Sequence, residues 1–214
     1  MKARERIHQS IESQIASGQL LPGDPISEDA LITQFGVSRT PVREAMLQMQ
    51  AEGLLTSLPR GGVVVAKMNV AQLFSMWELL AELEGMCARY ACERMSKEER
   101  ARLEAAHQAG AEAVRLDDEI AWQAANMAFH ECLYEGARNP YLRQEILRMR
   151  IRTQAYRKHA FGAVGRLSIS HRSHALIVKA ILANNSAAAA RAAFKHMSPD
   201  AKDLVMNLPK DLLG

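Results

Sequence analysis

Arg39 and Arg43 have the residue type and the spacing to recognise nucleic acid. They lie four residues apart, so on a helix they are neighbours on one face, opposite an apolar stripe that begins at Val42. A guanidinium group offers a bidentate fork that matches O6 and N7 of guanine, and Thr40 can reach a phosphate or a thymine methyl group. The alternative is that both arginines are solvated or pair with acidic side chains.

Histidines are the candidates for metal chemistry in the rest of the chain. Asn126 and His130 lie four residues apart and project to one helix face, His174 starts an apolar helical stripe, and His196 ends the next predicted helix. Three imidazoles and one oxygen donor from three helices suit a d-block cation such as zinc or nickel. Hydrogen-bonded core histidines are the alternative, and spacing alone leaves both possibilities open.

Three helices and a hairpin must position the two arginines. Apolar spacing and capping residues predict these helices over Arg4–Ser17, from Ser27 to Gly36, and from Ser38 or Thr40, with Pro41 in the first turn, to Gly53. Two short strands follow, Leu54–Leu58 and Val63–Ala66, with Arg60, Gly61 and Gly62 in the turn between them. A hairpin beside a helix-turn-helix is a wing, and Arg60 at its tip can enter a minor groove.

Helical stripes without any strand-like segment follow residue 69. The predicted helices are Val70–Met95, one that starts at the capping box of Ser96, Asp118–Ala137, Tyr141–His159, Ser168–Ala183 and Ser186–Met197, with a further short helix in Pro199–Gly214. Short connections between such helices indicate an antiparallel bundle. We therefore expect a mainly α chain with two domains, a winged helix-turn-helix in residues 1–67 and an all-α bundle in residues 68–214.

Composition excludes several classes of protein but does not assign a function. The net charge of +3 is too small to indicate nucleic acid by itself. No apolar run approaches the roughly 20 residues of a membrane span, and the N-terminus lacks the apolar segment of a signal peptide. We expect a cytoplasmic protein without a membrane partner. Three cysteines are too few for a zinc site with four cysteine ligands.

The segment from Phe35 to Ala45, with Ala51–Leu55 and the turn Arg60–Gly62, closely resembles the DNA-binding domain of GntR-family regulators. The resemblance implies a homodimer on a short palindromic operator of double-stranded DNA. The contacts that it implies come from Ser38, Arg39, Thr40, Pro41, Arg43, Arg60, Gly61 and Gly62. One departure is Asp29, where many relatives carry an arginine that touches DNA.

The second half resembles the FCD domain, the ligand-binding domain of the FadR-type branch. The matching landmarks are Phe129-His130, Asn139–Leu142, His174 with Ile177 and Ile181, and His196. In that family an aspartate and three histidines bind a metal inside the bundle, which implies Asn126, His130, His174 and His196 here, with Asn126 in place of the aspartate. Leu80 stands where many relatives carry an arginine that grips a carboxylate effector, so we expect Arg150 and Arg152 to take over that anchoring.

The main hypothesis is a non-enzymatic transcriptional regulator, a repressor or activator, whose operator affinity responds to a small carboxylate bound in a metal-containing bundle. A metal-dependent hydrolase using the same histidines is the first alternative. It would need a general base beside the metal, and Glu131 points about 100° away from His130 on a helix. A constitutive DNA binder whose bundle only dimerises is the second alternative.

Overall fold

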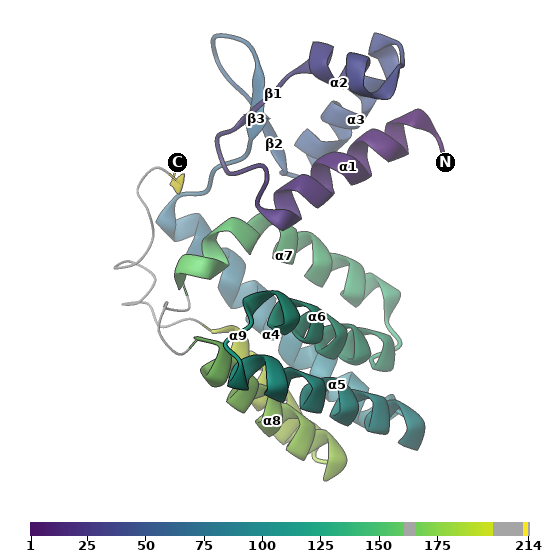
Figure 1. The fold of residues 1–214 in the computed structure, drawn as a ribbon, viewed down its shortest axis with the longest axis vertical. Helices are drawn as coiled ribbons and strands as arrows, with labels where there is room; N and C mark the ends of the chain where they lie inside the picture. Colours follow the sequence, from purple (N-terminus) through teal and green to yellow (C-terminus); the bar gives the residue numbers. More distant parts are fainter. Residues whose placement is uncertain (161–165, 199–211, 214) are drawn as a thin grey trace.

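The computed structural model describes residues 1–160, 166–198 and 212–213. We call α1–α3 and the three strands the head, and α4–α9 the bundle (Figure 1). In the head the elements are α1 (Ala3–Ser17), β1 (Pro25–Ile26), α2 (Glu28–Phe35), α3 (Arg39–Ala51), β2 (Leu55–Ser57) and β3 (Val63–Val65). In the bundle they are α4 (Val70–Arg94), α5 (Lys97–Arg115), α6 (Glu119–Gly136), α7 (Pro140–Ala160), α8 (Arg166–Leu182) and α9 (Ser186–Met197).

The head is a winged helix-turn-helix, as predicted. The side chain of Ser27 accepts a hydrogen bond from the backbone N–H of Ala30 and caps α2, and Gly36 ends that helix in the left-handed region, at φ 62°. The α1 and α3 helices bury one continuous apolar core, which includes Ile7, Ile11, Val42, Ala45 and Met49. This packing leaves the opposite face of α3 toward solvent.

The sheet has one strand more than the predicted hairpin. Its order is β1-β3-β2 with both pairs antiparallel, so β3 is central. No strand was predicted before α2, but Pro25 and Ile26 pair with Val64 and Val63. A two-residue strand leaves too short a pattern to be seen in the sequence.

The bundle agrees with the predicted helices to within a few residues, and Ser186–Met197 matches α9 at both ends. Capping boxes at Asn69 and Ser96 start α4 and α5, and Asp118 caps α6. The long α4 packs against α6, α7 and α9, while α5 packs against α6 and α8. The short helix expected in Pro199–Gly214 lies almost wholly outside the described residues. Among the helices that are described, none has the length and apolar character of a membrane span.

The head and the bundle meet along α1 and α7 (Figure 1). Ile151 of α7 packs against the apolar core of the head. Tyr156, also on α7, is fully buried beneath the linker between β3 and α4, where its hydroxyl accepts a hydrogen bond from the Met68 N–H and donates one to the Leu212 carbonyl. The α7 helix therefore holds both the head and the linker.

Candidate functional site

The face of α3 that carries Arg39 and Arg43 is open to solvent. Their side chains are 58% and 61% exposed, and both interact with acids of the neighbouring α2 helix. Arg43 Nε lies 2.8 Å from Glu28 Oε1, while Arg39 reaches Glu28 Oε1 at 3.3 Å and Asp29 Oδ1 at 3.1 Å. In this DNA-free state, therefore, Arg39 and Arg43 pair with acidic side chains, as one of the two interpretations of the sequence expected.

These ion pairs are weak enough for the two arginines to exchange them for other partners. Exposed ion pairs contribute only about 0–1 kcal/mol, so phosphates and base edges can replace the carboxylates. Ser38 and Thr40 are exposed beside them and Pro41 is half-buried in the first turn. Asp29, the departure from the family pattern, contacts a recognition arginine instead of supplying one.

The wing presents Arg60 at an exposed tip. Gly61 and Gly62 follow it with φ of 90° and 95°, a region that side chains other than glycine rarely adopt. The turn is closed by hydrogen bonds between Leu58 and these two glycines. The tip of this hairpin and α2 both lie at the end of the molecule away from the bundle (Figure 1).

A second site lies inside the bundle, where α6, α8 and α9 bring His130, His174 and His196 together. One ring nitrogen from each lies within 4.8 Å of the other two, and His174 Nε2 is 3.2 Å from His196 Nε2. Tetrahedral ligands at zinc–nitrogen distances of 2.0–2.1 Å are about 3.4 Å apart, which is close to the separation of His174 and His196. Ser173 Oγ, 2.6 Å from His196 Nδ1, fixes the orientation of that ring.

Aromatic rings wall the histidine cluster. Phe129 stacks on His174 with ring centroids 4.0 Å apart, and Trp122 lies on His174 at 5.7 Å. Burial and the neighbouring His196 hold the pKa of His174 far below its ordinary value. The ring is therefore neutral near pH 7 and keeps a lone pair for a ligand bond.

Arg150 of α7 reaches into the same place. Its Nη2 lies 3.0 Å from His130 Nδ1, and its Nε donates to Glu84 Oε1 at 2.7 Å. Glu84, only 2% exposed, also accepts a hydrogen bond of 2.7 Å from the Tyr134 hydroxyl. Burial alone would favour neutral Arg150, but the Glu84 carboxylate raises the pKa of Arg150 above its ordinary value. The pair is thus charged and buried next to the cluster.

The structure keeps Asn126 on the helix that carries His130 but separates Arg152 from this arrangement. Asn126 lies one turn before His130 on α6, half-buried. Arg152, which we expected to act with Arg150, lies between the head and the bundle, against Gly53. The reason is helical geometry, because residues two apart on a helix point about 200° apart. Arg150 therefore joins the histidines and Arg152 does not.

Sequence reasoning missed Glu84, Tyr134 and Ser173. Glu84 had a visible signal: it stands on the buried stripe of α4, three or four residues from Leu80, Ala81 and Ala88. A carboxylate on such a stripe is almost never buried without a partner. Tyr134 and Ser173 carried no comparable signal, since both residue types occur at many surface positions.

Known proteins agree with the fold. A model described as bacterial regulatory proteins of the gntR family matches residues 3–65, and an FCD domain model matches residues 75–199. An uncharacterized HTH-type transcriptional regulator from the ttuE–ttuC' intergenic region of Agrobacterium vitis is 33% identical over 129 residues, covering 59% of this chain and 75% of that protein. The HTH-type transcriptional repressor GlaR of Escherichia coli is 25% identical over 197 residues, covering 87% and 89%.

The solved structure of Escherichia coli McbR/YncC has the same fold, with a TM-score of 0.79 at 22% identity, over 96% of this chain and 98% of that one. The names of the relatives are those of transcriptional regulators and not of enzymes. The chain therefore belongs to the GntR family of DNA-binding transcriptional regulators, in the branch that carries an FCD domain.

Proposed function

We propose that this regulator changes its operator affinity when a small carboxylate binds, together with a divalent metal ion, at the histidine cluster of the bundle. The observation that carries the proposal is the meeting of three imidazoles and the buried Arg150–Glu84 pair in one place. A buried cluster of this composition has ligands for a cation and a donor for an anion. Replacing a buried ion pair by well-packed apolar residues is often neutral or stabilising, so the stability of the fold does not by itself account for this composition.

The residues that would hold the metal ion are His130, His174 and His196, with Asn126 as a neutral fourth donor. Zinc and nickel are the cations that imidazole ligands suit best. Such an ion supplies a positive anchor for one carboxylate oxygen. Histidine binds a metal ion as the neutral imidazole, and Arg150 is balanced by Glu84. The donor set therefore brings no net negative charge, which favours an anionic effector as the partner of the ion.

Arg150 would hold the other end of that effector. A guanidinium group has five N–H donors, and the Nε–H of Arg150 is used by Glu84. Its Nη groups face His130, so a carboxylate on the cluster lies within their reach. Leu80, where relatives carry an arginine, is fully buried in the apolar core, which leaves this role to Arg150.

The α7 helix would transmit binding to the head. Arg150 touches the histidine cluster, while the next residue, Ile151, packs into the core of the head. A shift of α7 that follows the rearrangement of Arg150 therefore moves the surface on which α1 rests. In a homodimer that binds two half-sites at a fixed separation, a small movement of each head changes operator affinity.

The DNA contacts in this proposal are those expected from the sequence. Arg39, Arg43 and Thr40 enter the major groove, and the wing from Arg60 to Gly62 reaches the minor groove or the backbone. Two separate apolar cores, one in the head and one that starts at Met68, support residues 1–67 and 68–214 as the two domains.

The test is a fluorescence-anisotropy titration of operator DNA from the promoter of the protein's own gene. We expect zinc with citrate to change the operator Kd about fivefold or more, a typical allosteric coupling, and His174→Ala to abolish this change while binding DNA normally. His171→Ala, one turn earlier on α8 and outside the cluster, is the matched control and keeps the response. An operator Kd that ignores metal and carboxylates in every combination would favour the constitutive DNA binder.

A further inference from the structure

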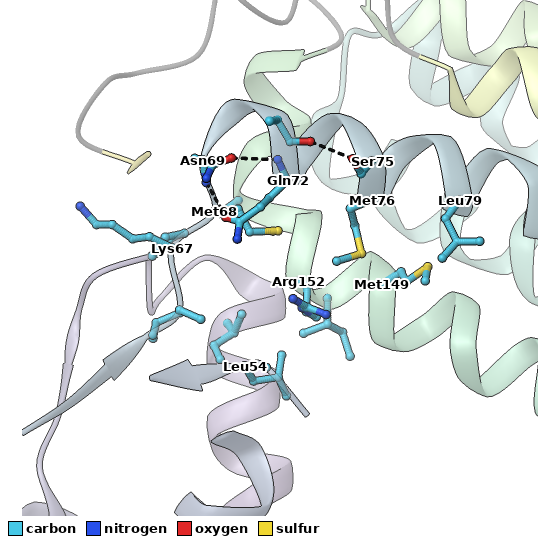
Figure 2. Close-up of a pocket in the computed structure, with 18 residues that line it drawn as sticks. Leu54, Lys67, Met68, Asn69, Gln72, Ser75, Met76, Leu79, Met149 and Arg152 are labelled. Atoms are coloured by element: carbon cyan, nitrogen blue, oxygen red, sulfur yellow. Dashed lines mark hydrogen bonds between the residues drawn. The ribbon is translucent and has the colours of Figure 1, made fainter. Parts of the chain in front are cut away.

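A pocket of about 640 Å³ lies between the head and the bundle. This volume falls in the range of small-molecule sites, about 300–1,000 Å³. The head contributes Ile15, Leu54 and Val65, while α4 and α7 contribute Met76, Leu79 and Met149 (Figure 2). Its lining is separate from the histidine cluster, none of whose three residues belongs to it.

Two basic residues, Lys67 and Arg152, line this pocket, and Arg152 is the one that lies between the head and α4. Figure 2 shows it between Leu54 of the head and Met76 of the bundle. Its guanidinium carbon lies 3.1 Å from the position that a Cβ on Gly53 would occupy, so the group rests directly on the backbone of the head. Gly53 has φ of 72°, and both this conformation and the close approach require glycine there.

The Nε–H of Arg152 is a buried and unused hydrogen-bond donor in the described part of the chain. Across residues 1–160, 166–198 and 212–213 no carboxylate forms an ion pair with it, and none of the residues that line the pocket is acidic. Leaving a buried donor without a partner is unfavourable, most of all in a charged group, and an anionic ligand would supply the missing acceptor.

The other residues that line the pocket indicate the chemistry of the rest of that ligand. Met76 and Met149 are flexible thioethers that make favourable contacts with aromatic rings, and Leu79 and Leu54 extend the apolar surface. Polar side chains, Asn69, Gln72 and Ser75, occur together at the start of α4. The lining thus fits one negative charge on a compact apolar ring system.

We propose that this pocket is a second ligand site, distinct from the histidine cluster, which takes an aromatic monocarboxylate with its carboxylate on Arg152. Because the lining comes from both the head and the bundle, a bound acid would fix their relative placement. The site shares no residue with the metal and effector site proposed above.

The experiment is isothermal titration calorimetry of the full chain with 1-naphthylacetate, in buffer containing EDTA so that metal at the histidine cluster plays no part. The neutral analogue 2-(1-naphthyl)ethanol reports the contribution of the charge. We expect the acid to bind the wild type, and the alcohol to bind about tenfold more weakly, as expected for a hydrogen bond to a charged group.

Two variants locate the binding. Arg152→Gln should lose at least tenfold in affinity for the acid and no longer distinguish it from the alcohol. Ala71→Trp, at an exposed lining position of α4, should block both ligands while Arg152 is retained. Arg148→Gln, one turn earlier on α7 and paired with Glu145 at the surface, is the matched control and should bind like the wild type. The proposal is overturned if the acid fails to bind the wild type in EDTA, or if neither Arg152→Gln nor Ala71→Trp weakens it.

Discussion

The head and the bundle use arginine in opposite ways. Arg39 and Arg43 are more than half exposed and share the acids of α2, whereas Arg150 is 15% exposed and is held by the buried Glu84. Exposed pairs contribute about 0–1 kcal/mol, but a buried charge that loses its partner destabilises a protein by about 3–5 kcal/mol. The exposed pairs of the head can therefore exchange their partners at little cost, whereas the buried pair of the bundle cannot.

Removing Glu84 tests the buried side of this comparison and should give the largest effect. We expect Glu84→Leu to lower the free energy of unfolding by about 3–5 kcal/mol, because Arg150 remains charged and buried. The double variant Glu84→Leu/Arg150→Met should recover most of this loss. Urea denaturation measures both. Glu112→Leu, which breaks an exposed pair with Arg115, is the control and should leave the midpoint unchanged; an equally small effect of Glu84→Leu would contradict the comparison.

Metal addition should stabilise the bundle through the same site. A ligand that binds only the folded chain at 100 times its Kd stabilises it by about 2.7 kcal/mol, so zinc should raise the melting temperature measured by differential scanning calorimetry. His174→Ala should remove this rise, and His171→Ala should retain it. A rise that survives His174→Ala would place the metal elsewhere.

The variants Arg39→Ala and Arg43→Ala test the exposed arginines of the head. Each bidentate contact to a base contributes about 1–3 kcal/mol of discrimination, so each variant should lose roughly ten- to hundredfold in operator affinity while its affinity for unrelated DNA changes far less. Anisotropy titrations on both DNAs measure this. Arg172→Ala, an exposed arginine of the bundle, should bind like the wild type, and retention of full operator specificity by both head variants would contradict the assignment.

Asp29→Asn should have the smallest effect and sharpens the comparison. It frees Arg39 from an exposed pair that contributes at most about 1 kcal/mol and removes a negative charge near the DNA. We expect binding to unrelated DNA to tighten by less than about fivefold, with a smaller ratio of operator to unrelated binding. Glu44→Gln, which removes a charge from α3 without touching Arg39, should tighten both equally. If Asp29→Asn and Glu44→Gln have the same ratio of operator binding to unrelated binding, Asp29 does not orient Arg39.

Much of this architecture could be predicted from the sequence because local signals mark it. Glycines and capping residues set the helix ends, as at Gly36 and Ser96, and apolar stripes identified the buried faces of α1 and α3. Apolar helical stripes marked the histidines as candidates, and the resemblance to the FCD domain grouped them as one site. Their meeting within 4.8 Å is a consequence of how α6, α8 and α9 pack.

What could not be predicted depends on contacts between distant elements. The partners of Glu84 lie 50 and 66 residues away in the chain, and no local pattern encodes them. The pairing of Asp29 with Arg39 depends on how α2 crosses α3. The different positions of Arg150 and Arg152 were open to prediction, since side chains two apart on a helix do not face each other.

Three consecutive residues of α7, from 150 to 152, serve the histidine cluster, the core of the head and the pocket between them. A hybrid regulator could join this bundle to a foreign DNA-binding domain at the linker. Such a hybrid would keep Ile151 and Arg152 but lose Gly53 and the apolar core of the head, which these two residues contact. Such a hybrid would bind its ligand and its DNA separately. To couple ligand binding to DNA binding again, the face of α7 that contacts the head has to be transferred together with the DNA-binding domain that it supports.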